Sequence, residues 1–262
     1  GETHFGFPTG RFSDGRLVPD FIAEFANLPI VPPPYLQPGF DQYHLGVNFA
    51  SGGAGALVET FQGDVIDLKT QLRYYMEVEN QLRKKLGNDE AEARITRAVF
   101  MFSIGSNDYL SQFLSNSSNF LGSYTFSEYV GMVVGNFSQV IKEIYDAGGR
   151  KFAIINLPPL GCLPITRQLN PQNDGGLCMD QVSQLASLHN EALSNLLLHL
   201  HKQLNGFRYS LFDMHSNVQR RIQNPAKFGF KRGVSACCGA GRFRGVYSCG
   251  GKRPVKEFEL CP

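Results

Sequence analysis

The chain has 262 residues, of which 42% are hydrophobic and 18% are charged. This balance is typical of a globular protein and excludes a disordered one. The formal net charge is only +2, and no dense basic tract indicates binding to nucleic acid. Because no apolar run is long enough to span a bilayer, we expect no integral membrane segment.

The first expected element is a helix from Leu17 to Phe25, with Pro19 tolerated in its first turn. Five prolines between Pro29 and Pro38 predict an extended loop. A short strand is expected at Val47 to Ala50, and it leads into Ser51-Gly52-Gly53-Ala54-Gly55. These glycines either let backbone N–H groups approach a ligand closely or form a tight turn. They do not fit the G-x-G-x-x-G pattern of a dinucleotide site.

Apolar residues at helical spacing predict a helix from Leu68 to Leu86, which Gly87 ends. The almost unbroken apolar run from Ala98 to Ile104 predicts a strand that is buried on both faces. The run stops at Gly105-Ser106-Asn107-Asp108, and ligands bind beyond the carboxyl ends of strands in open α/β sheets. The uncharged amide of Asn107 suits the stabilisation of an oxyanion, and the alternative is an ordinary turn.

A polar loop is expected from Ser111 to Ser123. Thr125 and Glu128 then form a capping box at the start of a helix with a wide apolar face. Gly148-Gly149 ends this helix, and the apolar segment from Lys151 to Leu157 predicts another buried strand. This strand is expected to deliver Pro158 to Cys162 to the same end of the sheet as Asn107.

A long helix is predicted from Val182 to Leu204, and we expect its His189, His199 and His201 to be solvated rather than to bind metal. The last strand is expected at Arg208 to Asp213. Asp213 and His215 lie two positions apart at the end of this strand, and we expect them to serve a cap or turn rather than a catalytic dyad. Alternating helices and strands predict an α/β fold, with a parallel sheet covered by helices on both faces.

The cysteines all lie in the second half of the chain, at Cys162, Cys178, Cys237, Cys238, Cys249 and Cys261. No pair has the Cys-x-x-Cys spacing of a zinc site, and an even number in loops indicates disulfides from an oxidising compartment. Cys162 and Cys178 form the natural local pair. Sequons at Asn116 and Asn136 agree with secretion, although Asn136 lies within a predicted helix.

Five stretches, taken together and in this order, resemble the plant GDSL esterase/lipase family of the SGNH hydrolases. They are TGRFSDGR from Thr9, VNFASGGAG from Val47, FSIGSNDY from Phe102, INLPPLGC from Ile155 and ACCGAG from Ala236. The resemblance implies one flavodoxin-like domain, a three-layer αβα sandwich, over residues 1–262. It also implies a secreted enzyme that hydrolyses a small-molecule acyl ester or a lipid, with no cofactor and no metal.

The family builds its site from a Ser in Gly-Asp-Ser, a Gly, an Asn and an Asp-x-x-His pair. By resemblance, the backbone N–H of Gly53 and the side-chain amide of Asn107 form the oxyanion hole. The family places Gly-Asp-Ser upstream of Gly1 and Asp-x-x-His beyond Pro262. We therefore expect both blocks to be absent here, so that the chain is a fragment that lacks the first strand of its sheet and is inactive alone.

Two other interpretations stay open. A degenerate family member could bind acyl ligands without a nucleophile, and the encoding sequence on either side of these residues would distinguish it from an enzyme. A complete enzyme could also transfer the acyl group to an alcohol instead of to water. Product analysis with an alcohol acceptor present separates acyl transfer from hydrolysis.

Overall fold

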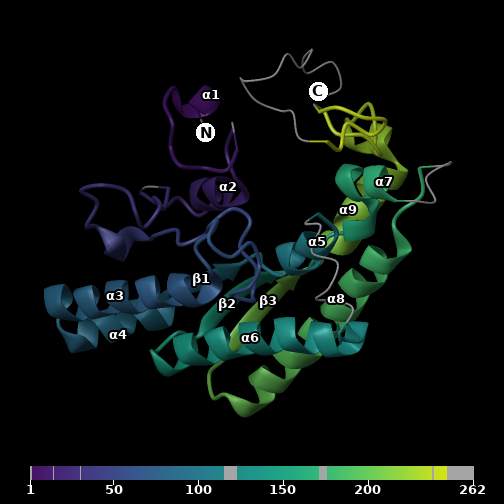
Figure 1. Ribbon diagram of the computed structural model, residues 1–262. Helices are drawn as coiled ribbons and strands as arrows, with labels where there is room; N and C mark the ends of the chain where they lie inside the picture. The colour runs from purple at the N-terminus through teal and green to yellow at the C-terminus, as the bar shows by residue number, and fades with distance from the viewer. Residues whose placement is uncertain are drawn as a thin grey trace. The chain divides into compact units, whose positions relative to one another are not determined.

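The computed structural model describes residues 2–13, 15–29, 31–114, 123–170, 176–237 and 239–246 (Figure 1). The chain divides into two compact units. The first contains residues Gly1–Val99 and Gln139–Lys151, and the second contains Phe100–Ser138 and Phe152–Pro262. The sequon at Asn116 and the cysteines Cys238, Cys249 and Cys261 lie outside the described residues.

The first unit is mainly helical. It contains α1 (Glu2–Phe5), α2 (Val18–Phe25), the 3-10 helix η1 (Tyr43–Leu45), α3 (Leu68–Leu86), α4 (Asn88–Arg97) and the end of α6 (Phe126–Asp146). The predicted helix with Pro19 in its first turn is confirmed as α2. The next predicted helix is α3, and Gly87 ends it with a φ of 82°. Helix α4, which packs against α3, was not predicted.

The strand predicted at Val47 to Ala50 is wrong. This segment forms only an isolated parallel bridge between Pro34 and Asn48. The Asn48 N–H donates to the Pro33 carbonyl at 2.8 Å, and the Tyr35 N–H donates to the Asn48 carbonyl at 2.8 Å. The bridge cannot lengthen on the proline side, because proline has no backbone N–H to donate to a ladder.

The second unit carries the sheet. Its elements are β1 (Val99–Phe102), α5 (Ser106–Leu114), the start of α6, β2 (Lys151–Ile155), η3 (Leu160–Cys162), α7 (Pro164–Leu169), α8 (Asp180–Gln203), β3 (Arg208–Phe212), α9 (Met214–Gln223) and η4 (Pro225–Phe228). The three strands are parallel and pair in the order β1-β2-β3. The α/β class is thereby confirmed, and helices with a parallel sheet fit the expected SGNH hydrolase fold.

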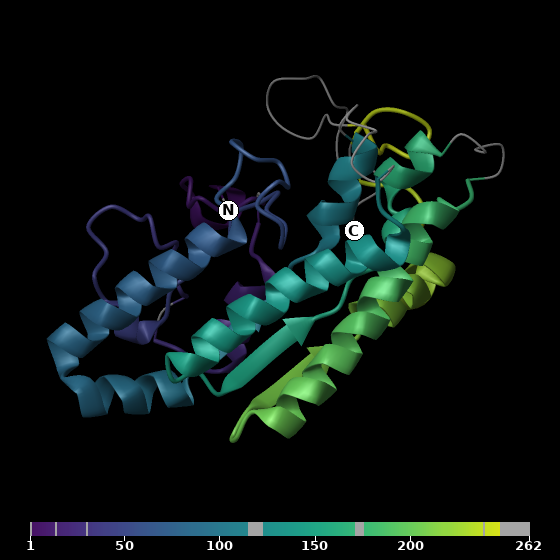
Figure 2. The same ribbon diagram turned by 60° about the horizontal axis from the view of Figure 1, so that its bottom comes forward.

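Aromatic side chains form the core at the sheet. Phe152 of β2 is 2% exposed and stacks between Phe100 of β1 and Phe207, which precedes β3. Phe102 packs edge-to-face on Phe137 of α6, and helix α8 contacts β3. In Figure 2 the strands β2 and β3 are seen between α6 and α8. The central position of β2 is consistent with the burial of Phe152 and Ile154, while the other residues of this strand are half-buried.

Burial of β1 on both faces is not observed. Val99 is 63% exposed, and the rest of β1 is half-buried. Because β1 pairs with β2 on one side only within the described sheet, its side chains have less cover than those of a central strand. A run of apolar residues indicates that a strand is suited to burial. Whether the strand is buried depends on its position in the sheet.

The capping box of α6 is confirmed. The Thr125 N–H donates to the Glu128 carboxylate at 2.8 Å, and the Thr125 hydroxyl accepts from the Glu128 N–H at 3.3 Å. The predicted apolar face of this helix is also buried as expected; it comprises Tyr129, Val130, Val133, Val134, Phe137, Val140, Ile141 and Ile144. The polar loop expected from Ser111 is wrong at its start, because α5 continues to Leu114.

Candidate active site

The carboxyl end of β1 leads into a tight junction at Gly105. This residue is buried and has a φ of 111°, which L side chains rarely adopt. A Cβ atom at Gly105 would lie 2.8 Å from Cε1 of His189 and 3.3 Å from Cδ2 of Leu157. Glycine is therefore required here, and the ends of β1 and β2 do meet, as the sequence predicted.

Asn107 lies on the first turn of α5, which begins directly at Ser106. The alternative of a simple turn is therefore wrong, because the backbone goes from Gly105 straight into a helix. Asn107 is half-buried. Helix N-termini carry partial positive charge, and the first turn of α5 also contains the buried acidic residue Asp108.

Two tyrosines hold the residues that follow Asn107. The Tyr129 hydroxyl, on α6, donates to the backbone carbonyl of Asp108 at 2.8 Å. The Tyr109 hydroxyl lies 2.8 Å from Nδ1 of His189, on α8. Tyr109 is fully buried, and its ring packs edge-to-face on both Tyr129 and His189. The first turn of α5 is thus fixed from two other helices.

His189 is 1% exposed, so the expectation that it is solvated is wrong. Burial lowers the pKa of His189 to about 4, which keeps the ring neutral near pH 7. Sequence reasoning missed this residue although a signal existed. His189 continues the spacing of the apolar residues of α8, four positions after Leu185 and four before Leu193, and both leucines are buried.

The loop after β2 is held by the next residue of α8. The Asn190 side chain accepts from the Leu157 N–H at 2.8 Å and donates to the Leu157 carbonyl at 2.9 Å. Further along, Gly161 lies so close to α8 that a Cβ would collide with the Met179 carbonyl and the Ser183 hydroxyl. This contact positions the loop from Pro158 to Cys162 against α8.

The predicted disulfide between Cys162 and Cys178 is confirmed, with a sequence separation of 16. The Met179 N–H donates to the Gly161 carbonyl at 2.8 Å, so a backbone bond flanks the bridge. Cys237 is also disulfide-bonded. Among the described residues no cysteine is free. The bridge ties the loop after β2 to the start of α8.

Gly53 occupies a turn of the first unit, where the Ala54 N–H donates to the Ser51 carbonyl at 3.1 Å. Its φ is 94°, and a Cβ would lie 3.0 Å from Cγ1 of Val65. Both facts require glycine for the turn itself. Because Asn107 belongs to the second unit, the pairing of these two residues in an oxyanion hole stays a prediction.

Asp213 and His215 serve the start of α9, a helix that was not predicted. The Asp213 carboxylate caps it by accepting from the Ser216 N–H at 3.0 Å. The hydrogen bonds from Ser216 hold the pKa of Asp213 below its usual value. The Asn156 side chain links both residues, since it donates to Asp213 at 3.1 Å and accepts from the His215 N–H at 3.0 Å. The predicted capping role is confirmed.

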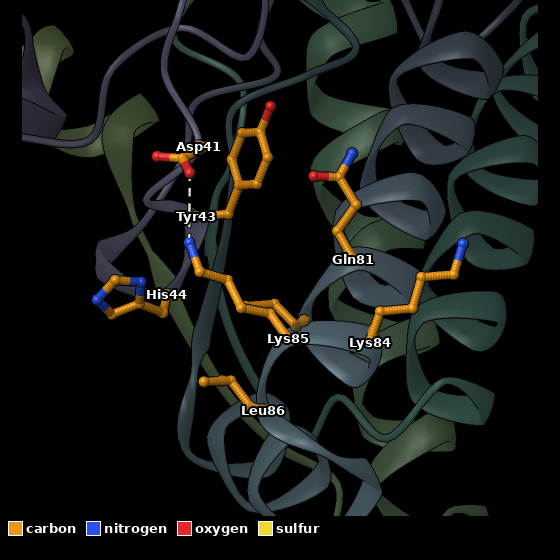
Figure 3. Close-up of a pocket in the computed structure, with 8 residues that line it drawn as sticks. Asp41, Tyr43, His44, Gln81, Lys84, Lys85 and Leu86 are labelled. Atoms are coloured by element: carbon orange, nitrogen blue, oxygen red, sulfur yellow. Dashed lines mark hydrogen bonds and ion pairs between the residues drawn. The ribbon is translucent and has the colours of Figure 1, made fainter.

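Contrary to our expectation, an Asp-x-x-His spacing does occur in this sequence, at Asp41 and His44. Both residues line a hollow of about 250 Å³ between η1 and the last turn of α3 (Figure 3). The Asp41 carboxylate faces Lys85 Nζ at 3.3 Å, and Figure 3 shows the His44 ring apart from it. The Asp41 carboxylate therefore pairs with Lys85 instead of orienting His44. No serine is among the residues that line this hollow, so a nucleophile is also missing from it.

A second hollow, of about 370 Å³, lies beside α8 and β3 in the second unit. It is lined by Asn156, Ser187, Asn190, Ser194, Leu211, Asp213 and His215. The side chains of Asn156, Asn190 and Asp213 already form hydrogen bonds to backbone groups, as described above. Within the described part of the chain, no group of three or more metal-ligating side chains could hold an ion. No helix in that part is long and apolar enough to cross a membrane.

The profile of the family "GDSL-like Lipase/Acylhydrolase" matches residues 3–244. "GDSL esterase/lipase 5" of Arabidopsis thaliana is 57% identical over 262 residues, which are 100% of this chain and 67% of the relative. "GDSL lipase" of Tanacetum cinerariifolium is 47% identical over 261 residues, with coverage of 100% and 67%. "Inactive GDSL esterase/lipase-like protein 25" of Arabidopsis thaliana is 35% identical over 254 residues, with coverage of 97% and 57%. The chain belongs to the GDSL-like lipase/acylhydrolase family, and its relatives named as esterases or lipases indicate a carboxylic ester hydrolase by family.

Proposed function

We propose that the protein hydrolyses small acyl esters or lipid esters by serine attack, and that Asn107 stabilises the oxyanion. The observation that carries this role is the place of Asn107. It lies on the first turn of α5, directly beyond β1, and side chains from α6 and α8 anchor the two residues after it. An amide donor on a turn whose neighbouring residues are anchored in this way is suited to a charge that develops only in the transition state.

The nucleophile must come from elsewhere. Gly-Asp-Ser does not occur in these 262 residues. The single Asp-x-x-His spacing lies at Asp41 and His44, and no serine is among the residues that line the hollow there. We place the catalytic Ser, His and Asp on sequence that flanks these residues, with the Gly53 N–H as a second oxyanion donor. On this proposal the 262-residue chain alone does not hydrolyse esters, because an oxyanion hole without a nucleophile has no intermediate to stabilise.

A non-catalytic protein that binds acyl ligands is the second candidate. A specific observation favours it, since one family relative carries the word "inactive" in its name. The full-length polypeptide, meaning these residues with whatever their transcript encodes on either side, decides between the two. A flanking Gly-Asp-Ser and turnover of p-nitrophenyl butyrate support the enzyme. Binding of a fatty acid without turnover supports the second candidate.

The role of Asn107 has its own test in the full-length polypeptide. Asn107→Ala should lower kcat by about 10²- to 10³-fold with a much smaller change in KM, because one oxyanion donor acts mainly on the transition state. Asn195→Ala, an exposed residue of α8, is the matched control and should leave kcat unchanged. Unchanged turnover in Asn107→Ala would remove this residue from the site.

We also propose that the protein is secreted. The disulfide between Cys162 and Cys178 supports folding in an oxidising compartment. The sequon at Asn136 gives weaker support: Asn136 is exposed on α6, whereas Ser138 of the same sequon is buried. Fractionation of plant tissue with an antibody against the chain tests the location, and a purely cytosolic signal would contradict it.

A further inference from the structure

We propose that His189 is a positioning residue for ester hydrolysis, because it holds Gly105 and Tyr109 and thereby sets where Asn107 presents its amide. The inference rests on the proposed role of Asn107. Gly105 and Tyr109 each lie two residues from Asn107, on either side of it. Both contact one imidazole ring, which is 1% exposed and lies on a different helix.

The neutral ring has one tautomer that suits its surroundings. The Tyr109 hydroxyl lies 2.8 Å from Nδ1 of His189. Among the described residues, Nδ1 is the hydrogen-bonding partner of this hydroxyl. If Nδ1 carried the proton, the buried Tyr109 hydroxyl would lack an acceptor and Nε2 would also be unpaired. With the proton on Nε2, Tyr109 donates to Nδ1 and a single buried group stays unpaired. This tautomer leaves fewer polar groups unsatisfied.

The other edge of the ring meets the backbone. His189 Nε2 is buried with no hydrogen-bonding partner among the described residues, and a Cβ at Gly105 would lie 3.2 Å from it. An apolar side chain at position 189 would remove the unpaired Nε2, but it would leave the buried Tyr109 hydroxyl without its acceptor. The histidine is therefore explained by its bond to Tyr109 beside the backbone of Gly105, and not by any pairing at Nε2.

These contacts restrict the conformation of the first turn of α5. Gly105 is pressed against the ring before Asn107, and Tyr109 is bonded to the same ring after it. The Tyr129 hydroxyl holds the Asp108 carbonyl from α6. A misplacement of a catalytic donor by about 1 Å is enough to lower the rate strongly. His189 thus acts through Asn107 and does not touch the reacting atoms.

The test measures kcat and KM of the full-length polypeptide with p-nitrophenyl butyrate, normalised to the fraction labelled by a fluorophosphonate. His189→Phe keeps a flat ring but removes the acceptor, and it should lower kcat roughly 10- to 100-fold with KM within about twofold. His189→Asn returns an acceptor near the place of Nδ1 and should recover most of the loss. Tyr109→Phe removes only the hydroxyl and should also lower kcat. It serves as the test if His189→Phe fails to fold.

A double substitution separates positioning from a general loss of structure. Because His189 acts through Asn107, Asn107→Ala with His189→Phe should be no slower than Asn107→Ala alone. Leu200→Ala, a buried residue elsewhere on α8, is the control: it should lower the melting temperature without lowering kcat per labelled site.

The outcomes distinguish this inference from the proposed function. If Asn107→Ala slows turnover but His189→Phe does not, or if the two losses add, the positioning role is wrong and the role of Asn107 stands. If His189→Asn is as slow as His189→Phe, the bond to Tyr109 is not the cause. If Asn107→Ala has no effect, or the full-length polypeptide has no turnover at all, both proposals are overturned.

Discussion

Asn190 pairs with both backbone groups of Leu157, accepting from its N–H at 2.8 Å and donating to its carbonyl at 2.9 Å. Leu157 is the second residue after β2, and it is 2% exposed. A strand that has ended cannot satisfy these groups within the sheet, so the amide of α8 replaces a neighbouring strand. The preceding residue, His189, bonds to the Tyr109 hydroxyl of α5 and lies against Gly105, which follows β1. Two successive residues of one helix therefore fix two neighbouring strand ends.

Asn190→Ala is expected to lower the free energy of unfolding of the full-length polypeptide by about 2 to 4 kcal/mol. The reason is that the N–H and the carbonyl of Leu157 both become unpaired in a buried place, at about 1 to 3 kcal/mol for each group. Urea denaturation measures the change. Asn136→Ala is the matched control, because Asn136 is exposed and its side chain donates to the Met132 carbonyl of its own helix. Equal effects of the two substitutions would contradict this account of Asn190.

The free energy of unfolding should depend on pH through the protonation of His189. Its pKa is lowered to about 4 by burial, against an ordinary value of 6.5 that applies in the unfolded chain. Between these values the unfolded chain binds a proton that the folded protein does not, so stability is lost as the pH falls from about 6.5 towards 4. The loss approaches roughly 3 kcal/mol at the acid end.

The measurement compares urea unfolding of the full-length polypeptide and of its His189→Phe variant between pH 7 and pH 4.5. Carboxylates titrate in both proteins, so the difference between them isolates His189. The variant should lose less stability on acidification. Leu200→Ala lowers stability without removing a titratable group, so its profile should run parallel to that of the unsubstituted protein. Parallel profiles for His189→Phe would show that the ring is not kept neutral by burial.

Local patterns predicted most of the elements because each has a local cause. The capping box at Thr125 and Glu128, the end of α3 at Gly87 and the cap at Asp213 depend on residues within one turn of each other. The disulfide between Cys162 and Cys178 was predictable for a similar reason, since both cysteines flank one loop.

Long-range partners were not predictable in the same way. The segment around Asn48 looks like a strand, yet its bridge to Pro34 cannot extend through prolines. Val99 looks like core, yet it lies 63% exposed at the start of a strand with one neighbour. For the site, the sequence singled out Asn107 by its place after a strand. It did not reveal that the residue is held through a histidine 82 positions further along the chain, because that relation exists only in the packing of α5 against α8.

Two glycines on helices or beside them should respond in opposite directions to alanine. At Gly161 a Cβ would collide with the Met179 carbonyl, which belongs to the backbone and cannot rotate away. Gly161→Ala should lower the free energy of unfolding by more than about 3 kcal/mol or prevent folding, since overpacking against backbone is among the largest single effects. Gly135 is exposed on α6 with no atom within 4 Å of its added Cβ.

Gly135→Ala should therefore raise the free energy of unfolding by about 0.5 to 1 kcal/mol, through the helix propensity of alanine. Thermal melts followed by circular dichroism measure both variants of the full-length polypeptide. A Gly161→Ala protein with an unchanged melting temperature would mean that the loop from Pro158 to Cys162 is not packed on α8 as described.

Removal of the bridge by Cys162→Ala together with Cys178→Ala should lower the free energy of unfolding by about 3 kcal/mol. A cross-link over 16 residues restricts the unfolded chain by that amount in the loop-entropy account. The folded loop should keep its course, because the bond from the Met179 N–H to the Gly161 carbonyl, 2.8 Å long, spans the same junction. Denaturation in urea measures the loss. The unsubstituted protein with a reducing agent is its control, and it should fall by at least as much, because Cys237 is also disulfide-bonded. Peptide mapping without reduction tests the pairing itself, and recovery of Cys162 as a free alkylated thiol from secreted protein would contradict it.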